Sequence, residues 1–151
     1  MNINLPQDIE TLEELQNKTP ATVVCVTDQF ACERIICAGR KVADITKTPL
    51  TVITVADTHR QPDPQALQHL FNVSKDNDAE MNMFCSDEPA KRIITFIKEN
   101  KVANVLTGIP QNSNSVLFRM YRTFTHIKFF TVDIDGTVSE VLERAPQNIR
   151  A

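Results

Sequence analysis

A polar loop within residues 107 to 120 carries the residue types that hold phosphate groups. The stretch, TGIPQNSNSVLFRM, places a glycine and several small polar residues between an apolar run and a helical pattern. Gly108 would let the backbone approach an anion, and Ser115 would begin a helix whose N-terminus favours negative charge. Arg119 lies about one turn beyond Ser115 and would supply a cation. The residues assigned to this predicted anion or nucleotide site are Gly108, Gln111, Ser113, Asn114, Ser115 and Arg119.

A second group of polar residues follows two predicted strands. Thr27 and Asp28 come directly after the apolar run ATVVCV, and Asp57 follows the run LTVITVA. A carboxylate at the start of a loop can bind a ligand or cap the next helix, and the sequence does not separate these roles for Asp28. For Asp57 the simpler interpretation is a polar loop residue.

No catalytic or metal-binding motif accompanies these residues. The sequence has no G-x-S-x-G elbow and no P-loop motif, so we expect a protein that is not an enzyme. The three histidines, His59, His69 and His126, lack the spacing of metal ligands. We therefore predict no metal site.

The four cysteines, Cys25, Cys32, Cys37 and Cys85, form no C-x-x-C pair and no zinc spacing. Cys25 lies in a predicted buried strand and is expected to be inert. Cys32 and Cys85 follow strand ends and are expected to be more accessible. A thiol sensor needs exposure and a lowered pKa, and the sequence shows neither.

The composition indicates a soluble protein of one main domain. The chain has 151 residues, of which 42% are hydrophobic and 23% charged. A net charge of −3 argues against nucleic-acid binding, which needs a basic face. No apolar run approaches the roughly 20 residues of a membrane span, and the acidic first residues do not resemble a secretory signal. We therefore expect a cytoplasmic protein that binds neither membranes nor nucleic acid.

Hydrophobic periodicity predicts alternating helices and strands along the chain. Helices are predicted at residues 8–17, 31–46, 65–73, 86–101 and 115–125, and strands at residues 21–26, 50–56, 79–85, 102–107 and 127–134. Ser86 or Asp87 is expected to cap the fourth of these helices. A tight turn at Asp135-Gly136 would let the following segment, TVSEVL, fold back as a short extra strand.

Strict alternation of this kind requires parallel strands joined by right-handed crossovers, with helices on both faces of the sheet. The predicted fold class is α/β, with a Rossmann-like five-stranded parallel sheet at residues 21 to 134. A helical extension, residues 1 to 20, precedes it, and a turn, short strand and tail follow at 135 to 151. Ligands bind such sheets beyond the carboxyl ends of the strands, at the switch point. The first and fourth strands should flank that point, which would bring the two polar groups together.

Three stretches together resemble a known family: VVCVTDQFACERIICAGRKVAD, SDEPAKRIITFIKENKVANVLTG and NSVLFRMYRTFTHIKFFTVDI. They resemble the universal stress proteins, and most closely the universal-stress-like domain of bacterial potassium sensor kinases. The resemblance covers roughly residues 21 to 134. It implies a sheet of the adenine nucleotide alpha hydrolase-like type, a bacterial stress-response or signalling role, and a homodimer.

The resemblance also implies a nucleotide site, from which this sequence departs. Many members bind ATP through a loop of glycine, two residues, glycine, nine residues and Gly-Ser or Gly-Thr. Gly108 matches the first glycine, but Gln111 stands at the second and Asn114-Ser115 replaces the final pair in a shorter loop. In ATP-binding relatives the acid at the position of Asp28 lies near the base or ribose, and the backbone near Asp57 contacts adenine. We expect a degenerate nucleotide-binding loop.

These features predict a non-catalytic, cytoplasmic regulatory or ligand-sensing module. Two alternatives stay open: an ATP-binding universal stress protein with slow ATPase activity, and a protein-interaction module with a vestigial pocket. ATP or another adenine nucleotide is the only cofactor that the resemblance suggests. A protein partner would contact the N-terminal helix or a face formed by Arg119, Arg122 and His126.

The sequence also gives a local reason to expect a homodimer. The predicted last strand, KFFTVDI, is apolar and lies at an edge of the sheet, and an exposed apolar edge must be covered. A symmetric partner or the fold-back segment TVSEVL could cover it, and the second would compete with the first.

Overall fold

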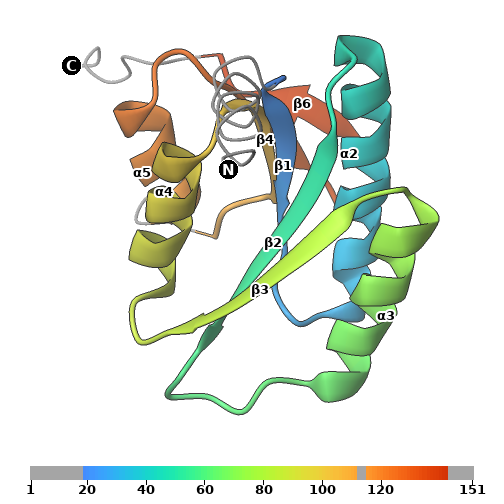
Figure 1. The fold of residues 1–151 in the computed structure, drawn as a ribbon, viewed down its shortest axis with the longest axis vertical. Coiled ribbons are helices and arrows are strands. Elements are labelled where there is room, and N and C mark those ends of the chain that lie inside the picture. The colour runs from blue at the N-terminus through green and yellow to red at the C-terminus, as the bar shows by residue number, and fades with distance from the viewer. Residues whose placement is uncertain (1–18, 112–114, 143–151) are drawn as a thin grey trace, which may run out of the picture.

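The described residues form one sheet between two layers of helices (Figure 1). The computed structural model describes residues 19–111 and 115–142. The predicted helix at 8–17 and the tail after residue 142 lie outside these ranges. None of the helices in the described ranges is long and apolar enough to cross a membrane.

The sheet has six strands in the described part of the chain, in the order β3-β2-β1-β4-β5-β6. The strands are β1 (Ala21–Cys25), β2 (Leu50–Asp57), β3 (Glu80–Ser86), β4 (Val102–Gly108), β5 (Lys128–Val132) and β6 (Val138–Glu140). The first five are parallel, and β6 is antiparallel to β5. The prediction of a five-stranded sheet was therefore wrong by one strand. The fold-back segment supplies the sixth.

The turn before β6 explains why the chain folds back. Gly136 has a φ of +90°, a conformation that favours glycine. Its N–H donates to the carbonyl of Asp133, and the N–H of Asp133 donates to the carbonyl of Thr137. These bonds reverse the chain and place β6 along the edge of β5.

Helices cover both faces of the sheet, as predicted. They are α2 (Glu33–Thr46), preceded by the short 3-10 helix η1 (Phe30–Cys32), α3 (Pro64–Asp76), α4 (Pro89–Glu99) and α5 (Val116–Thr123). Figure 1 shows α2 and α3 on one face, and α4 and α5 on the other.

Two details of the predicted helices were wrong. Helix α4 begins after Glu88, which makes no side-chain cap, and the hydroxyl of Ser86 instead accepts a hydrogen bond from the Glu88 N–H at 2.9 Å. Proline at the first position of α4 already lacks one of the N–H groups that a cap would satisfy. Helix α5 ends at Thr123, so His126 does not share a helix face with Arg119.

The core forms one cluster on each face of the sheet. Alternation along β1 sends Val24 toward α2 and Val23 toward α4 and α5. Helix α2 packs closely on β1 because Gly39 has no side chain, and a Cβ at this position would overlap the side chain of Val24. This packing fixes the start of α2 beside the carboxyl ends of the strands.

Candidate functional site

The loops that carry most of the predicted site residues meet at one end of the sheet. Strands β1 and β4 are neighbours, with Val24 opposite Leu106. The chain then continues outward from β1 into α2 and outward from β4 into α5, so the switch point lies between them. The prediction that the first and fourth strands flank the switch point is confirmed.

Asp28 joins the loop after β1 to the loop after β2. One carboxylate oxygen accepts a hydrogen bond from Nη2 of Arg60 at 2.6 Å, and the other accepts from the N–H of Asp63 at 2.7 Å. The side chain of Asp28 is only 9% exposed. The hydrogen bond from Arg60 is the main cause that holds the pKa of Asp28 below its usual range. Both carboxylate oxygens are thus engaged within the protein.

A small cavity lies beneath this ion pair. Its volume is about 40 Å³, and its lining includes Thr27, Asp28, Ala56, Arg60 and Met83. This space holds about one water molecule and is much smaller than a purine ring.

The remaining residues of the first two loops make local contacts. The hydroxyl of Thr27 lies 3.5 Å from the thiol of Cys32. The carboxylate of Asp57 accepts a hydrogen bond from the N–H of His59 at 2.9 Å, which shapes a turn in its own loop. Asp57 is not among the residues that line the cavity below Asp28.

A cation lies beside Gly108 at the end of β4. A Cβ at Gly108 would come 3.3 Å from Nη2 of Arg34. The Arg34 guanidinium donates to the carbonyls of Asp133 at 2.7 Å, Ala31 at 2.8 Å and Val132 at 3.4 Å. In the described ranges no carboxylate forms an ion pair with Arg34. Its positive charge is held at the switch point by backbone carbonyls.

The start of α5 faces the same end of the sheet. Ser115 occupies the N-cap position but makes no side-chain cap, and its buried hydroxyl finds no hydrogen-bond partner among the described residues. Gln111 and Arg119 are exposed. The predicted site residues Ser113 and Asn114 lie outside the described residues.

Arg92, near the start of α4, likewise forms no ion pair with a carboxylate among the described residues. The guanidinium of Arg92 sits 3.9 Å from the centroid of the Phe84 ring. Its buried Nη1 has no hydrogen-bond partner in the part of the chain that the structure describes. Sequence reasoning missed both Arg34 and Arg92. No motif marks them, since the contacts of Arg34 with β5 span 98 and 99 residues.

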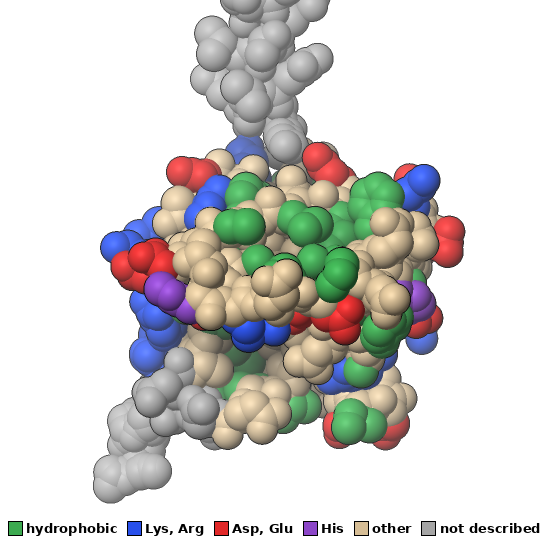
Figure 2. Space-filling model, turned by 90° about the horizontal axis from the view of Figure 1, so that it is seen from below, with side chains coloured by type: hydrophobic (Ala, Val, Ile, Leu, Met, Phe, Trp, Pro, Cys, Tyr) green, Lys and Arg blue, Asp and Glu red, His purple; other side chains and the backbone are tan. Residues whose placement is uncertain are grey.

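The charges at this end of the molecule are mixed. Figure 2 shows basic, acidic and apolar side chains interspersed on one face, without a broad basic patch. Arginine, backbone N–H groups and a hydroxyl suit the binding of an anion. Among the described residues, no group of three histidine, cysteine or acidic side chains could hold a metal ion.

The cysteines differ in accessibility. Burial raises the pKa of the Cys25 thiol to about 12. Cys32 is buried in η1, so the expectation that it is accessible was wrong, because the chain turns into η1 and packs the thiol against the core. Cys85 is exposed, as expected.

Comparison with known proteins finds similarity in structure alone. No family model matches the chain, and no curated protein matches it. A universal stress protein from Archaeoglobus fulgidus matches with a TM-score of 0.58 and 16% identity, over 72% of this chain and 90% of that one. A universal stress protein solved with cAMP matches with a TM-score of 0.60 and 16% identity, over 78% and 99%. A protein of the universal stress protein family from Burkholderia pseudomallei matches with a TM-score of 0.52 and 16% identity, over 77% of this chain and 98% of that one.

These three structures have the same α/β arrangement as this chain over nearly their whole lengths. At 16% identity the likeness concerns the fold. The chain has an α/β fold like that of these universal stress proteins, and its described sheet consists of five parallel strands and the antiparallel edge strand β6.

Proposed function

We propose that this chain is a non-catalytic sensing module that binds a small anionic ligand between the end of β4 and the start of α5. The observation that carries the proposal is the Arg34 guanidinium beside Gly108, a cation without a carboxylate partner in the described ranges. The buried hydroxyl of Ser115 and the N-terminus of α5 supply further donors at the same end of the sheet.

The ligand that suits this site carries a single phosphate group. Gly108 is the one glycine in the stretch from residue 107 to 120, and Gln111 and Asn114 stand where the resembling family has glycines. A triphosphate needs more backbone N–H groups than such a loop can bring close to it. One solved structure of similar fold contains cAMP, a nucleotide with one phosphate. A nucleotide of this kind would also require Arg60 to release Asp28, because the cavity there is only about 40 Å³.

The proposed role is regulatory and cytoplasmic. Ligand binding would order the loop after β4 and change the surface that a partner protein meets, without bond chemistry. The module would also form a homodimer. Strand β6 already pairs with the edge of β5 that a partner strand would use, so the dimer would form through β6 itself or through another surface. The proposal of a sensing module does not depend on which surface forms the dimer.

The test is thermal unfolding with inorganic phosphate, cAMP, AMP and ATP in parallel. A ligand at 100 times its Kd adds about 2.7 kcal/mol to the free energy of unfolding, a shift on the order of several degrees for this size. We expect a shift with a singly phosphorylated ligand that Arg34→Gln removes and Arg34→Lys partly keeps. Arg122→Gln, at an exposed position late in α5, is the matched control.

Two results would overturn the proposal. The first is that no phosphorylated ligand shifts the melting temperature. The second is that Arg34→Gln binds as tightly as the unchanged protein. Circular dichroism of each variant separates loss of binding from loss of folding.

A further inference from the structure

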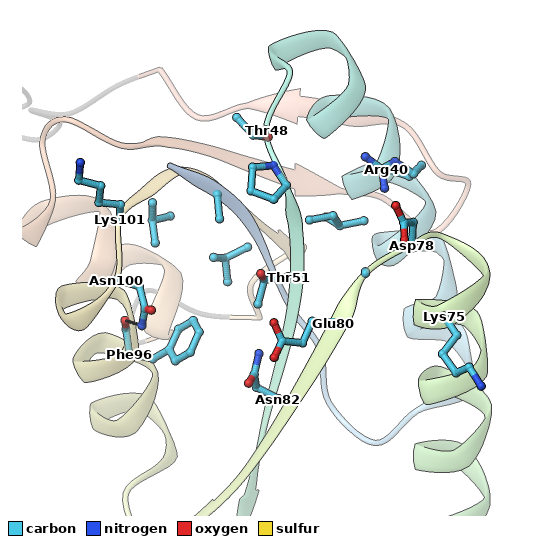
Figure 3. A pocket seen from close by; sticks show the side chains of 16 residues that line it. Arg40, Thr48, Thr51, Lys75, Asp78, Glu80, Asn82, Phe96, Asn100 and Lys101 are labelled. Atoms are coloured by element: carbon cyan, nitrogen blue, oxygen red, sulfur yellow. Dashed lines mark hydrogen bonds between the residues drawn. The ribbon is translucent and has the colours of Figure 1, made fainter. Parts of the chain in front are cut away.

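A large hollow lies at the opposite end of the sheet from the anion site (Figure 3). Its volume is about 890 Å³. It is lined by the first residues of four strands, namely Ala21, Leu50, Glu80 and Val102. It is therefore formed by the amino ends of the strands and is separate from the carboxyl-end site.

The walls of the hollow combine apolar and charged groups. Figure 3 shows Phe96 on the last turn of α4 and Asn100 directly after that helix, across from Glu80 and Asn82 on β3. Pro49, directly before β2, adds a further apolar side chain that is exposed. The charged residues of the lining are Arg40, Lys75, Lys101, Asp78 and Glu80, three basic and two acidic. Mixed signs of this kind suit a surface with an apolar face and a charged margin better than a small ion of one sign.

The chain itself provides such a surface. Residues 8 to 17 place Ile9, Leu12 and Leu15 on one face of a predicted helix. Four acids accompany them, and these are Asp8, Glu10, Glu13 and Glu14. Such a segment is apolar on one side and acidic on the others, which complements an apolar hollow with an excess of basic residues.

A short connection between residues 8 to 17 and Ala21 keeps this segment close to the hollow. Only Thr19 and Pro20 separate residues 1 to 18, which lie outside the described ranges, from Ala21 in the lining. The proline favours an extended conformation at Thr19, so a preceding helix would end before it. A ten-residue helix is about 15 Å long, and so short a connection keeps it at high effective concentration beside the hollow.

We propose that residues 8 to 17 of this chain dock in the hollow as an amphipathic helix, with Leu12 and Leu15 against Pro49 and Phe96. The acidic side chains lie toward the basic margin.

The test compares hydrogen exchange of the full chain with that of the full-chain double variant Leu12→Asp/Leu15→Asp. We expect faster exchange in the double variant at residues 21–23 and 96–102, with little change at the carboxyl-end loops. The control variant Thr11→Asp/Asn17→Asp adds the same two charges away from the predicted apolar face and should leave the exchange unchanged. Equal exchange in both double variants and the unchanged protein would overturn the proposal.

Two further experiments make the test specific: a rescue with a synthetic peptide, and two variants of opposite charge at Asn100. A synthetic peptide of residues 1 to 18, added to Leu12→Asp/Leu15→Asp, should restore the slow exchange, and the same peptide with both leucines changed to aspartate should not. Asn100→Glu should raise exchange at the hollow, whereas Asn100→Lys should not, although both lose the bond to the Phe96 carbonyl. Absence of rescue, or equal effects of the Asn100 variants, would contradict docking and favour another occupant.

Discussion

Asp28 and Arg60 are 32 residues apart, and their side chains meet at 2.6 Å across two loops of the carboxyl-end face. The second carboxylate oxygen of Asp28 fixes the N–H of Asp63, whose own carboxylate caps α3. The contact therefore links the loop after β1 to the start of α3. Both side chains also line the small cavity of about 40 Å³ at this end of the sheet.

We predict that Asp28→Asn lowers the free energy of unfolding by about 1 to 3 kcal/mol at pH 7, the usual cost of leaving charged hydrogen-bond partners unpaired. Arg60 holds the pKa of Asp28 below its ordinary value of 3.8. The stabilisation is therefore complete above about pH 4 and is lost as the pH falls through the lowered pKa. Denaturant unfolding from pH 7 down to pH 3 checks this. Asp44→Asn, at an exposed pair with Arg40, is the control and should change little.

This account is contradicted if the difference in the free energy of unfolding between Asp28→Asn and Asp44→Asn stays constant down to pH 3. A constant difference would mean that Asp28 contributes through packing or through an amide-compatible hydrogen bond, not through its charge.

We predict that Gly39→Ala destabilises the protein by about 1 to 3 kcal/mol, because an added methyl group overlaps Val24 in a packed interface. The substitution would otherwise favour a helix, since alanine has the higher helix propensity. Thermal unfolding distinguishes the two effects by sign. Restored stability in Gly39→Ala/Val24→Ala would identify the overlap as the cause.

The proposed anion site gives a prediction that concerns ligand affinity more than stability. Gly108→Val should weaken binding of a phosphate-containing ligand at least tenfold, because the side chain would enter the space beside Nη2 of Arg34. Stability should change less, since the end of an arginine side chain can move aside. Calorimetric titration and thermal unfolding of the same sample measure the two effects. A large loss of stability with unchanged affinity would contradict the placement of the ligand.

The thiols should react in a fixed order with an alkylating reagent at pH 8. Cys85 is exposed and should react first. Cys32 is buried, and the Cys25 thiol has a pKa of about 12, so both should react only on unfolding. Mass spectrometry of peptides after timed quenching gives the order. Early modification of Cys25 would show that β1 opens in the native protein.

The order of elements and the switch point could be predicted because they depend on local patterns. The continuous apolar runs at β1, β2 and β4 and the amphipathic helices between them repeat along the sequence, and topology rules then place β1 beside β4. Strand β6 was harder to predict. It has three residues, all exposed, so it lacks the buried apolar run of β1, β2 and β4, and only the turn at Asp135-Gly136 indicated it.

The chemistry of the site depends on contacts that no local pattern encodes. Arg34 reaches the carbonyls of Val132 and Asp133 only after α2 and β5 come together. Asp28 could bind a ligand or serve the fold, and the sequence left both roles open. Its ion pair with Arg60 depends on the course of the loop after β2, which local periodicity does not determine.

The fold-back strand leads to the last prediction, which concerns self-association. Gly136 has a φ of +90°, so a β-branched residue there is strained, whereas asparagine tolerates positive φ more readily. Gly136→Val should loosen β6 and uncover the edge of β5, which then offers unpaired backbone groups to a second copy. We expect sedimentation velocity to show stronger self-association for Gly136→Val than for Gly136→Asn at equal concentration. If the two variants associate equally, β6 does not control access to the edge of β5, and any dimer uses another surface.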